Sequence, residues 1–144
     1  MIRVDCVAPE KFGDAWLVAG DKLLRGMHAA GMPIVGTMDE IKAGSLLLWL
    51  VSRPEPAEIL GVFLTDLLRR RNGQLTVSVA ALSGESVGEW ASEMDAALVG
   101  YAKGAGAEAV RFIGRPGWAR LIPALRKIDT LESGQVLFER PANV

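Results

Sequence analysis

The segment 74–113 constrains the fold most, because it places one long helix between two stretches typical of strands. Residues 74–82 alternate apolar and polar side chains, and residues 109–113 are a short apolar run. Residues 87–103 carry apolar side chains at steps of three and four, which predicts an amphipathic helix. A strand that returns through a long helix lies parallel to its partner. The segment therefore predicts a parallel strand pair with a crossover helix. The apolar face of the helix contains Trp90, Met94, Ala97, Leu98 and Tyr101.

Three consecutive strands before this helix predict an antiparallel meander. The run at 45–52 is almost entirely apolar, so we expect a strand that is buried on both faces. The next strand covers 58–68, where Gly61 indicates a bulge. The Asn-Gly pair at 72–73 is typical of a hairpin and joins this strand to the one that begins at 74.

The stretch before the meander predicts one strand and two helices. Residues 2–7 alternate weakly, and Pro9 opens an amphipathic helix that should stop near Gly31. Thr37 is followed three residues later by a glutamate, which is the spacing of a capping box. We therefore expect Thr37 to be the N-cap of a short helix that Gly44 ends.

After the crossover unit, we expect a helix over 118–125, a closing strand over 135–140 and a loosely held end over 141–144. The complete order is strand, helix, helix, three-strand meander, helix, strand, helix, strand. This order predicts a single α/β (α+β) domain over residues 1–144, built on a mixed sheet.

Composition excludes several classes of site. Half of the residues are hydrophobic and the formal net charge is −1, so the chain can bury a core and has no global field that attracts nucleic acid. The single cysteine, Cys6, excludes an intramolecular disulfide and a thiolate metal cluster, and we expect it to be a small core residue. The single histidine, His28, excludes a multi-histidine metal site. We expect His28 to interact with the C-terminus of the first helix.

The sequence shows no membrane or secretion signal. The N-terminus lacks a long apolar stretch behind basic residues, and the most apolar run, 46–51, is too short to span a bilayer. We therefore expect a cytoplasmic protein.

Four short pieces, in this order, narrow the interpretation of the fold. They are Leu-Trp-Leu at 48–50, Gly-Val-Phe-Leu-Thr at 61–65, Glu-Trp at 89–90 and Gly-Arg-Pro-Gly-Trp-Ala-Arg at 114–120. With this order of elements, nearly the whole chain resembles the GCN5-related N-acetyltransferase (GNAT) fold. It is similar to a group of short phage-encoded proteins with that fold, which includes proteins resembling the internal virion proteins of short-tailed phages.

The resemblance implies where a cofactor would bind. Catalytic members of the fold carry an Arg/Gln-x-x-Gly-x-Gly/Ala pattern after the fourth strand, and its backbone amides hold the pyrophosphate of coenzyme A. The matching segment, 81–90, has Gly84 and Gly88 but no basic residue. Its two acids, Glu85 and Glu89, would repel a diphosphate. The candidate cofactor-binding residues are Ser83, Gly84 and Gly88.

The resemblance also implies catalytic groups, which are incomplete here. Members of the family often protonate the leaving thiolate with a tyrosine on the fourth helix, but residues 118–125 contain none. The only tyrosine, Tyr101, lies on the long helix, where its spacing indicates core packing, and it is the remaining candidate for a catalytic role. Glu58 and Glu85 are the candidates for the general base.

Two groups of arginines have both a functional and a structural interpretation. Arg115 and Arg120 flank a Pro-Gly-Trp turn, which predicts either an anion or docking site or a rigid turn anchored by Trp118. The hairpin tip carries Arg69, Arg70 and Arg71. This run predicts either a contact with phosphates or an acidic partner, or a solvated tip that protects a strand edge.

Three functions are consistent with these features. The first is a phage-type protein that keeps the fold for a structural or partner-binding role without a cofactor, in the virion or the host cytoplasm, with a protein partner or self-association. The second is an N-acyltransferase that uses acetyl-CoA through an altered loop. The third is a DNA-associated protein that uses Arg69–Arg71 and Arg115.

Overall fold

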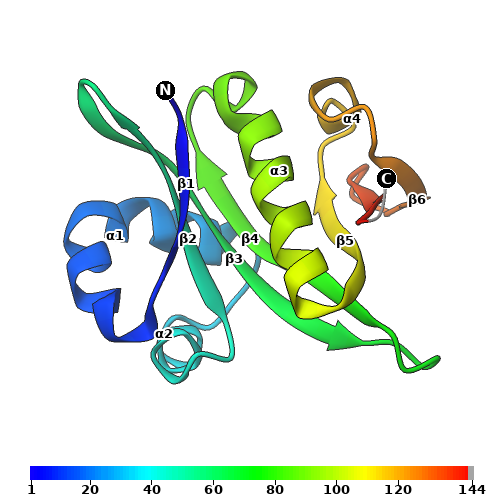
Figure 1. Cartoon of the computed structure of the whole chain (residues 1–144), viewed down its shortest axis with the longest axis horizontal. Helices are drawn as coiled ribbons and strands as arrows, with labels where there is room; N and C mark the ends of the chain where they lie inside the picture. The colour runs from blue at the N-terminus through cyan, green and yellow to red at the C-terminus, as the bar shows by residue number, and fades with distance from the viewer. Residues whose placement is uncertain (143–144) are drawn as a thin grey trace. The chain divides into compact units, whose positions relative to one another are not determined.

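The computed structural model describes residues 1–142, which contain seven strands and four α-helices (Figure 1). The strands form one mixed sheet in the order β1-β2-β3-β4-β5-β7-β6. The elements are β1 (Arg3–Val7), a 3-10 turn (Pro9–Lys11), α1 (Phe12–Ala29), α2 (Ile34–Ala43), β2 (Leu47–Pro54), β3 (Ala57–Arg69), β4 (Leu75–Gly84), α3 (Val87–Ala105), β5 (Ala107–Gly114), α4 (Trp118–Leu121), β6 (Arg126–Thr130) and β7 (Val136–Pro141).

The chain divides into two compact units. The first unit contains Met1–Asp66 and Ala80–Trp90, and the second contains Leu67–Val79 and the chain from Ala91 onward. The expectation of a single domain over 1–144 stays a prediction, and residues 143–144 lie outside the described range.

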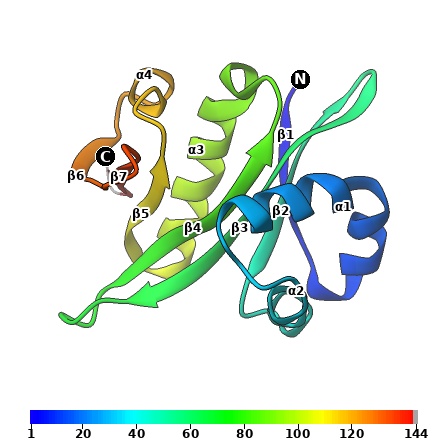
Figure 2. The ribbon, with the colours of Figure 1, turned by 180° about the vertical axis from the view of Figure 1, so that it is seen from behind.

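The core of the first unit lies between its two helices and one face of the strands (Figure 2). Side chains alternate across a strand, so β2 and β3 each present every second residue to α1 and α2. The apolar face of α1 recurs at steps of three and four, as the sequence predicts. The buried residues of this core are Phe12, Ala15, Ala19, Leu23, Met27, Ile41, Leu46, Leu48, Val62, Leu64 and Ala81.

The opposite face of β2 and β3 is aromatic. Trp49 and Phe63 stack with their ring centroids 5.5 Å apart, and the indole N–H of Trp49 donates to the hydroxyl of Thr65 at 2.9 Å. Because the indole is buried, this hydrogen bond satisfies a donor that would otherwise destabilise the fold.

Two glycines on this face make room for the first turn of α3. A Cβ at Gly61 would lie 2.8 Å from the ring of Trp90, and a Cβ at Gly84 would lie 2.6 Å from the carbonyl oxygen of Leu60. The register between β2 and β3 shifts beside Gly61, which confirms the predicted bulge. Trp90 is fully buried, so both glycines are needed for packing.

The second unit contains the predicted parallel pair. The first half of β4 runs parallel to β5, β5 is antiparallel to β7, and β7 is antiparallel to β6. Figure 1 shows α4 directly after the end of β5. The ring of Trp118 meets Phe112 edge-on at 5.3 Å, and Phe112 also contacts Phe138. The crossover through α3 is therefore confirmed.

The C-terminal region differs from the prediction in two ways. The helix predicted over 118–125 ends at Leu121, because Pro123 disfavours a helical conformation at Ile122, whose φ and ψ are −128° and 91°. The predicted order of elements also lacks β6. All five residues of β6 are exposed, so no alternation of apolar and polar side chains marks it.

Two further boundaries differ from expectation. Pro33 rather than Thr37 is the N-cap of α2, since its extended backbone precedes Ile34 directly, and Thr37 is buried inside the helix. The end predicted to be loose over 141–144 is partly held. Pro141 belongs to β7, and the N–H of Ala142 donates to the carbonyl of Glu108 at 2.8 Å.

Substitution of Gly84 by alanine should destabilise the protein by about 2–3 kcal/mol, because the added methyl overlaps backbone and the buried ring of Trp90. Urea denaturation followed by circular dichroism measures the change in the free energy of unfolding. Gly13→Ala in the first turn of α1 is the control, since its Cβ meets nothing within 4 Å. Equal stabilities for the two variants would contradict the proposed packing.

Candidate functional site

The junction of β4 and α3 is the segment that the sequence analysis singled out for a cofactor. β4 ends at Gly84, α3 begins at Val87, and Ser86 between them has a φ of +54°. The first N–H groups of a helix have no partner within the helix. In the part of the chain that the structure describes, no residue accepts a hydrogen bond from the amides of Ser86, Val87 and Gly88. The helix dipole adds partial positive charge at this end, so the junction offers three donors to an anion.

The backbone of the junction is held in place by hydrogen bonds on both sides of Glu85. The amide of Glu85 donates to the carbonyl of Leu60 at 2.8 Å, and the indole N–H of Trp90 donates to the carbonyl of Glu85 at 2.7 Å. The junction is therefore rigid next to an exposed helix start.

Two cations from distant parts of the sequence neutralise the acids of the junction. Lys22 on α1 lies 3.6 Å from the carboxylate of Glu85. Arg53 on β2 donates to Glu89 and lies 3.7 Å from Glu58. Segment 81–90 contains no basic residue, and the sequence does not predict these two cations because no local pattern links them to the junction. The repulsion expected from its acids is therefore largely offset.

The three predicted cofactor-binding residues have different surroundings. Ser83 and Gly84 belong to β4, where Ser83 lies against Gly26 of α1 and Gly84 against Leu60. A Cβ at Gly88 would meet nothing within 4 Å. Of the three, Gly88 alone faces open space at the helix start.

The catalytic candidates are divided between the units. Glu58 and Glu85 are in the first unit, and each forms an ion pair, with Arg53 and Lys22 respectively. Tyr101 is half-buried on the part of α3 that belongs to the second unit. The roles of Glu58, Glu85 and Tyr101 in acid–base chemistry stay predictions.

The arginine run at the hairpin tip is largely engaged within the protein. Arg69 donates to the carbonyl of Gly73 at 2.7 Å, and Gly73 has the positive φ expected of the Asn-Gly turn. Arg70 forms ion pairs with Glu108 and Glu139 of the same unit, and Arg71 is exposed. The solvated tip predicted for all three residues therefore describes Arg71 best.

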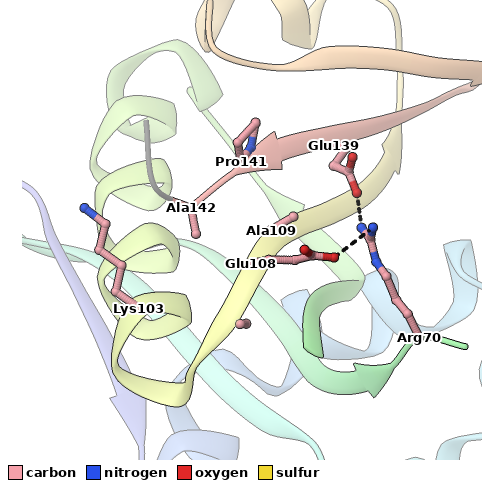
Figure 3. Close-up of a pocket in the computed structure, with 8 residues that line it drawn as sticks. Arg70, Lys103, Glu108, Ala109, Glu139, Pro141 and Ala142 are labelled. Atoms are coloured by element: carbon pink, nitrogen blue, oxygen red, sulfur yellow. Dashed lines mark hydrogen bonds and ion pairs between the residues drawn. The ribbon is translucent and has the colours of Figure 1, made fainter. Parts of the chain in front are cut away.

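Arg70 holds the hairpin tip to β5 and β7 beside a pocket of about 320 Å³ (Figure 3). Its guanidinium donates to Thr76 at 2.6 Å, lies 3.0 Å from Glu108 and donates to Glu139. Arg111 also donates to Glu139, at 3.1 Å. Burial raises the pKa of Glu139, but the hydrogen bonds and charges of the two arginines outweigh burial and lower this pKa below its usual value.

The turn after β5 has the structural role that one interpretation predicted. A Cβ at Gly114 would lie 2.8 Å from the ring of Trp118, so Gly114 lets that ring pack on Phe112. Arg115 and Arg120 are exposed, and their predicted role in anion or partner contact stays a prediction.

The lone cysteine and the lone histidine lie on different elements, Cys6 on β1 and His28 on α1. Cys6 is exposed rather than buried in the core as expected, because β1 is an edge strand. Partial desolvation still raises the pKa of its thiol, which makes it a poor nucleophile at neutral pH. His28 is in the last turn of α1. Across residues 1–142, no three His, Cys, Asp or Glu side chains gather closely enough to hold a metal ion.

The described residues also contain no helix with the length and apolar character needed to cross a membrane.

No protein-family model matches the sequence, and no curated protein sequence matches it either. Solved structures are similar over the whole chain. NAA60 from Arabidopsis thaliana in complex with acetyl-CoA has a TM-score of 0.65 at 13% identity and covers 100% of both chains. FeeM, an N-acyl amino acid synthase from uncultured soil microbes, has a TM-score of 0.63 at 12% identity, covering 99% of this chain and 93% of its own.

A predicted acetyltransferase from Clostridium acetobutylicum with acetyl-CoA has a TM-score of 0.59 at 12% identity and covers 92% of this chain and 95% of its own. These similarities show the predicted GNAT-like fold. They give no support to the phage-encoded, virion-associated part of the prediction, or to the expectation that no cofactor binds.

Glu139→Gln should lower the free energy of unfolding by about 1–2 kcal/mol at pH 7, because it removes the charge that binds two arginines. The pKa of Glu139 is lower in the folded chain than in the unfolded chain, so its stabilisation is present above about pH 4.5 and is lost as the pH falls through the folded pKa. The difference from wild type should therefore shrink below pH 4.5.

Urea denaturation at pH 7 and at several values below pH 4.5 measures this difference. Glu132→Gln changes an exposed glutamate of the same unit. Its free energy of unfolding should differ little from that of wild type, both at pH 7 and below pH 4.5. A penalty for Glu139→Gln that stays constant with pH would contradict the role of the arginines.

Proposed function

We propose that the protein is an N-acyltransferase that takes its acyl group from coenzyme A through the β4–α3 junction. The observation that carries the proposal is the row of amides at Ser86, Val87 and Gly88, which begins a helix and has no protein acceptor among residues 1–142. The chain that carries these amides is similar in fold to acetyltransferase structures. Two of these structures contain acetyl-CoA, and they cover 100% and 92% of this chain. Backbone amides at a helix start are a common binding site for diphosphate.

The residues of the junction fit a phosphate group. A Cβ at Gly88 would meet nothing within 4 Å, and a residue with positive φ, such as Ser86, can turn successive N–H groups toward one side. The ion pairs with Lys22 and Arg53 offset the charges of Glu85 and Glu89. The junction is therefore close to electrically balanced, so its amides can attract an anion.

The proposed reaction requires an acyl donor and groups that accept and supply protons. Acyl-coenzyme A, when bound, supplies the acyl group as a reactive thioester. The acceptor amine forms the new C–N bond as the C–S bond breaks, and it loses a proton while the thiolate gains one. Glu58 and Glu85, both in the first unit, are the residues proposed to accept the proton from the amine.

DNA binding receives less support from the positions of the arginines. The hairpin tip lies at the start of β5, since Leu75 pairs with Ala107, whereas Arg115 follows the end of β5. A strand advances about 3.3 Å per residue, so the two positions are about 25 Å apart. Arg69 and Arg70 also donate hydrogen bonds to groups within the protein, Arg69 to the carbonyl of Gly73 and Arg70 to the hydroxyl of Thr76.

Gly88→Asp tests the proposal without weakening the fold. An acid in the first turn of a helix is favourable, and replacing glycine in a helix also stabilises, so the melting temperature should stay or rise. The new carboxylate faces the open space and should lower the affinity for acetyl-CoA at least about tenfold through repulsion. Titration calorimetry measures the affinity.

Gly88→Ala is the matched control, because it adds the Cβ without the charge and should bind acetyl-CoA nearly as wild type does. Wild-type protein that binds no acetyl-CoA at millimolar concentration, or Gly88→Asp protein that binds as wild type does, would refute the proposed site.

A further inference from the structure

The two ion pairs at the β4–α3 junction are asymmetric in burial. The side chain of Lys22 is 20% exposed whereas that of Glu85 is 63% exposed. The side chain of Arg53 is 28% exposed whereas that of Glu89 is 54% exposed. In each pair, the cation is the enclosed member and the acid is the member that faces solvent.

The backbones of all four residues are held in place by regular structure or by hydrogen bonds, so the two members of each pair differ in how far their side chains are enclosed. Lys22 precedes the buried Leu23 on α1, and Arg53 stands opposite Glu58 in the register of β2 and β3. The side chains of Glu85 and Glu89 extend from the exposed junction and the first turn of α3. An acid can therefore rotate into water while its cation stays beside the helix start.

A phosphate is a better partner for these cations than an exposed carboxylate. Exposed ion pairs contribute little to stability, so their separation costs little. Phosphate oxygens accept short charge-assisted hydrogen bonds, and an arginine can bind two of them at once. The same phosphate would also accept from the free amides at Ser86, Val87 and Gly88.

We propose that Lys22 and Arg53 bind the phosphates of the acyl donor, and that Glu85 and Glu89 are resident counter-ions that these phosphates displace. This inference rests on the proposed function. It assigns the positive charge of the site to α1 and β2, outside the loop where the GNAT pattern has its basic residue.

Counter-ion exchange makes a prediction that a structural ion pair does not. In a structural pair, loss of either partner disturbs the junction, so both substitutions change donor affinity in the same direction. In an exchange, loss of the cation weakens donor binding and loss of the acid strengthens it. The sign of the two effects therefore separates the two roles.

The experiment is a calorimetric titration of the full chain with acetyl-CoA. Lys22→Gln and Arg53→Gln should each weaken binding about tenfold, and Glu85→Gln and Glu89→Gln should each strengthen it about threefold. Arg25→Gln and Glu93→Gln are controls that change the net charge equally at exposed positions. Each should change the affinity less than about twofold. Melting temperatures confirm that each variant is folded.

The outcomes separate this inference from the proposed function. Wild-type protein that binds no acetyl-CoA overturns both. Wild-type binding with Lys22→Gln and Arg53→Gln unchanged overturns the exchange alone. If a cation variant fails to fold, the acid variants still decide, because both acids are exposed. Weaker or unchanged binding by Glu85→Gln and Glu89→Gln overturns the exchange.

Discussion

The indole of Trp90 is the contact on which the geometry of the β4–α3 junction depends. It fills the space that Gly61 and Gly84 leave free, and its N–H holds the carbonyl of Glu85. The helix start is thereby set against the first residues of β3, and its first amides have no acceptor among residues 1–142. A smaller side chain would leave a cavity under the first turn of α3, and any side chain at the two glycines would push the turn away. Packing and the proposed anion site are therefore one arrangement.

The charges around the junction show how an acidic loop can still favour an anion. Local sequence gives the loop two negative charges, but the electrostatic potential depends on all groups within several ångströms. Lys22 and Arg53 reach the junction because α1 packs on β2 and β3 and because β2 ends beside the first turn of α3. The charge of such a site is a property of the tertiary structure.

The strongest periodic patterns of the sequence predicted most of the fold. The crossover through α3, the Asn-Gly hairpin and the bulge at Gly61 all follow from local signals that tertiary packing reinforces. Exposed elements escaped prediction, since β6 has no buried face and therefore no alternation. The loop position was found through the GNAT pattern, whereas its cations were not. Ion pairs between distant segments leave no trace in a single sequence.

The exposed strand β6 forms one end of the sheet, so its outer edge has no neighbouring strand in the described part of the chain. Such an edge is a template on which another chain can add a strand and begin to aggregate. β6 carries Arg126, Lys127 and Asp129, all exposed, and charged side chains on an edge strand oppose the addition of another strand. The exposed, charged side chains that leave β6 without an alternating pattern are thus the same feature that opposes strand addition at this edge.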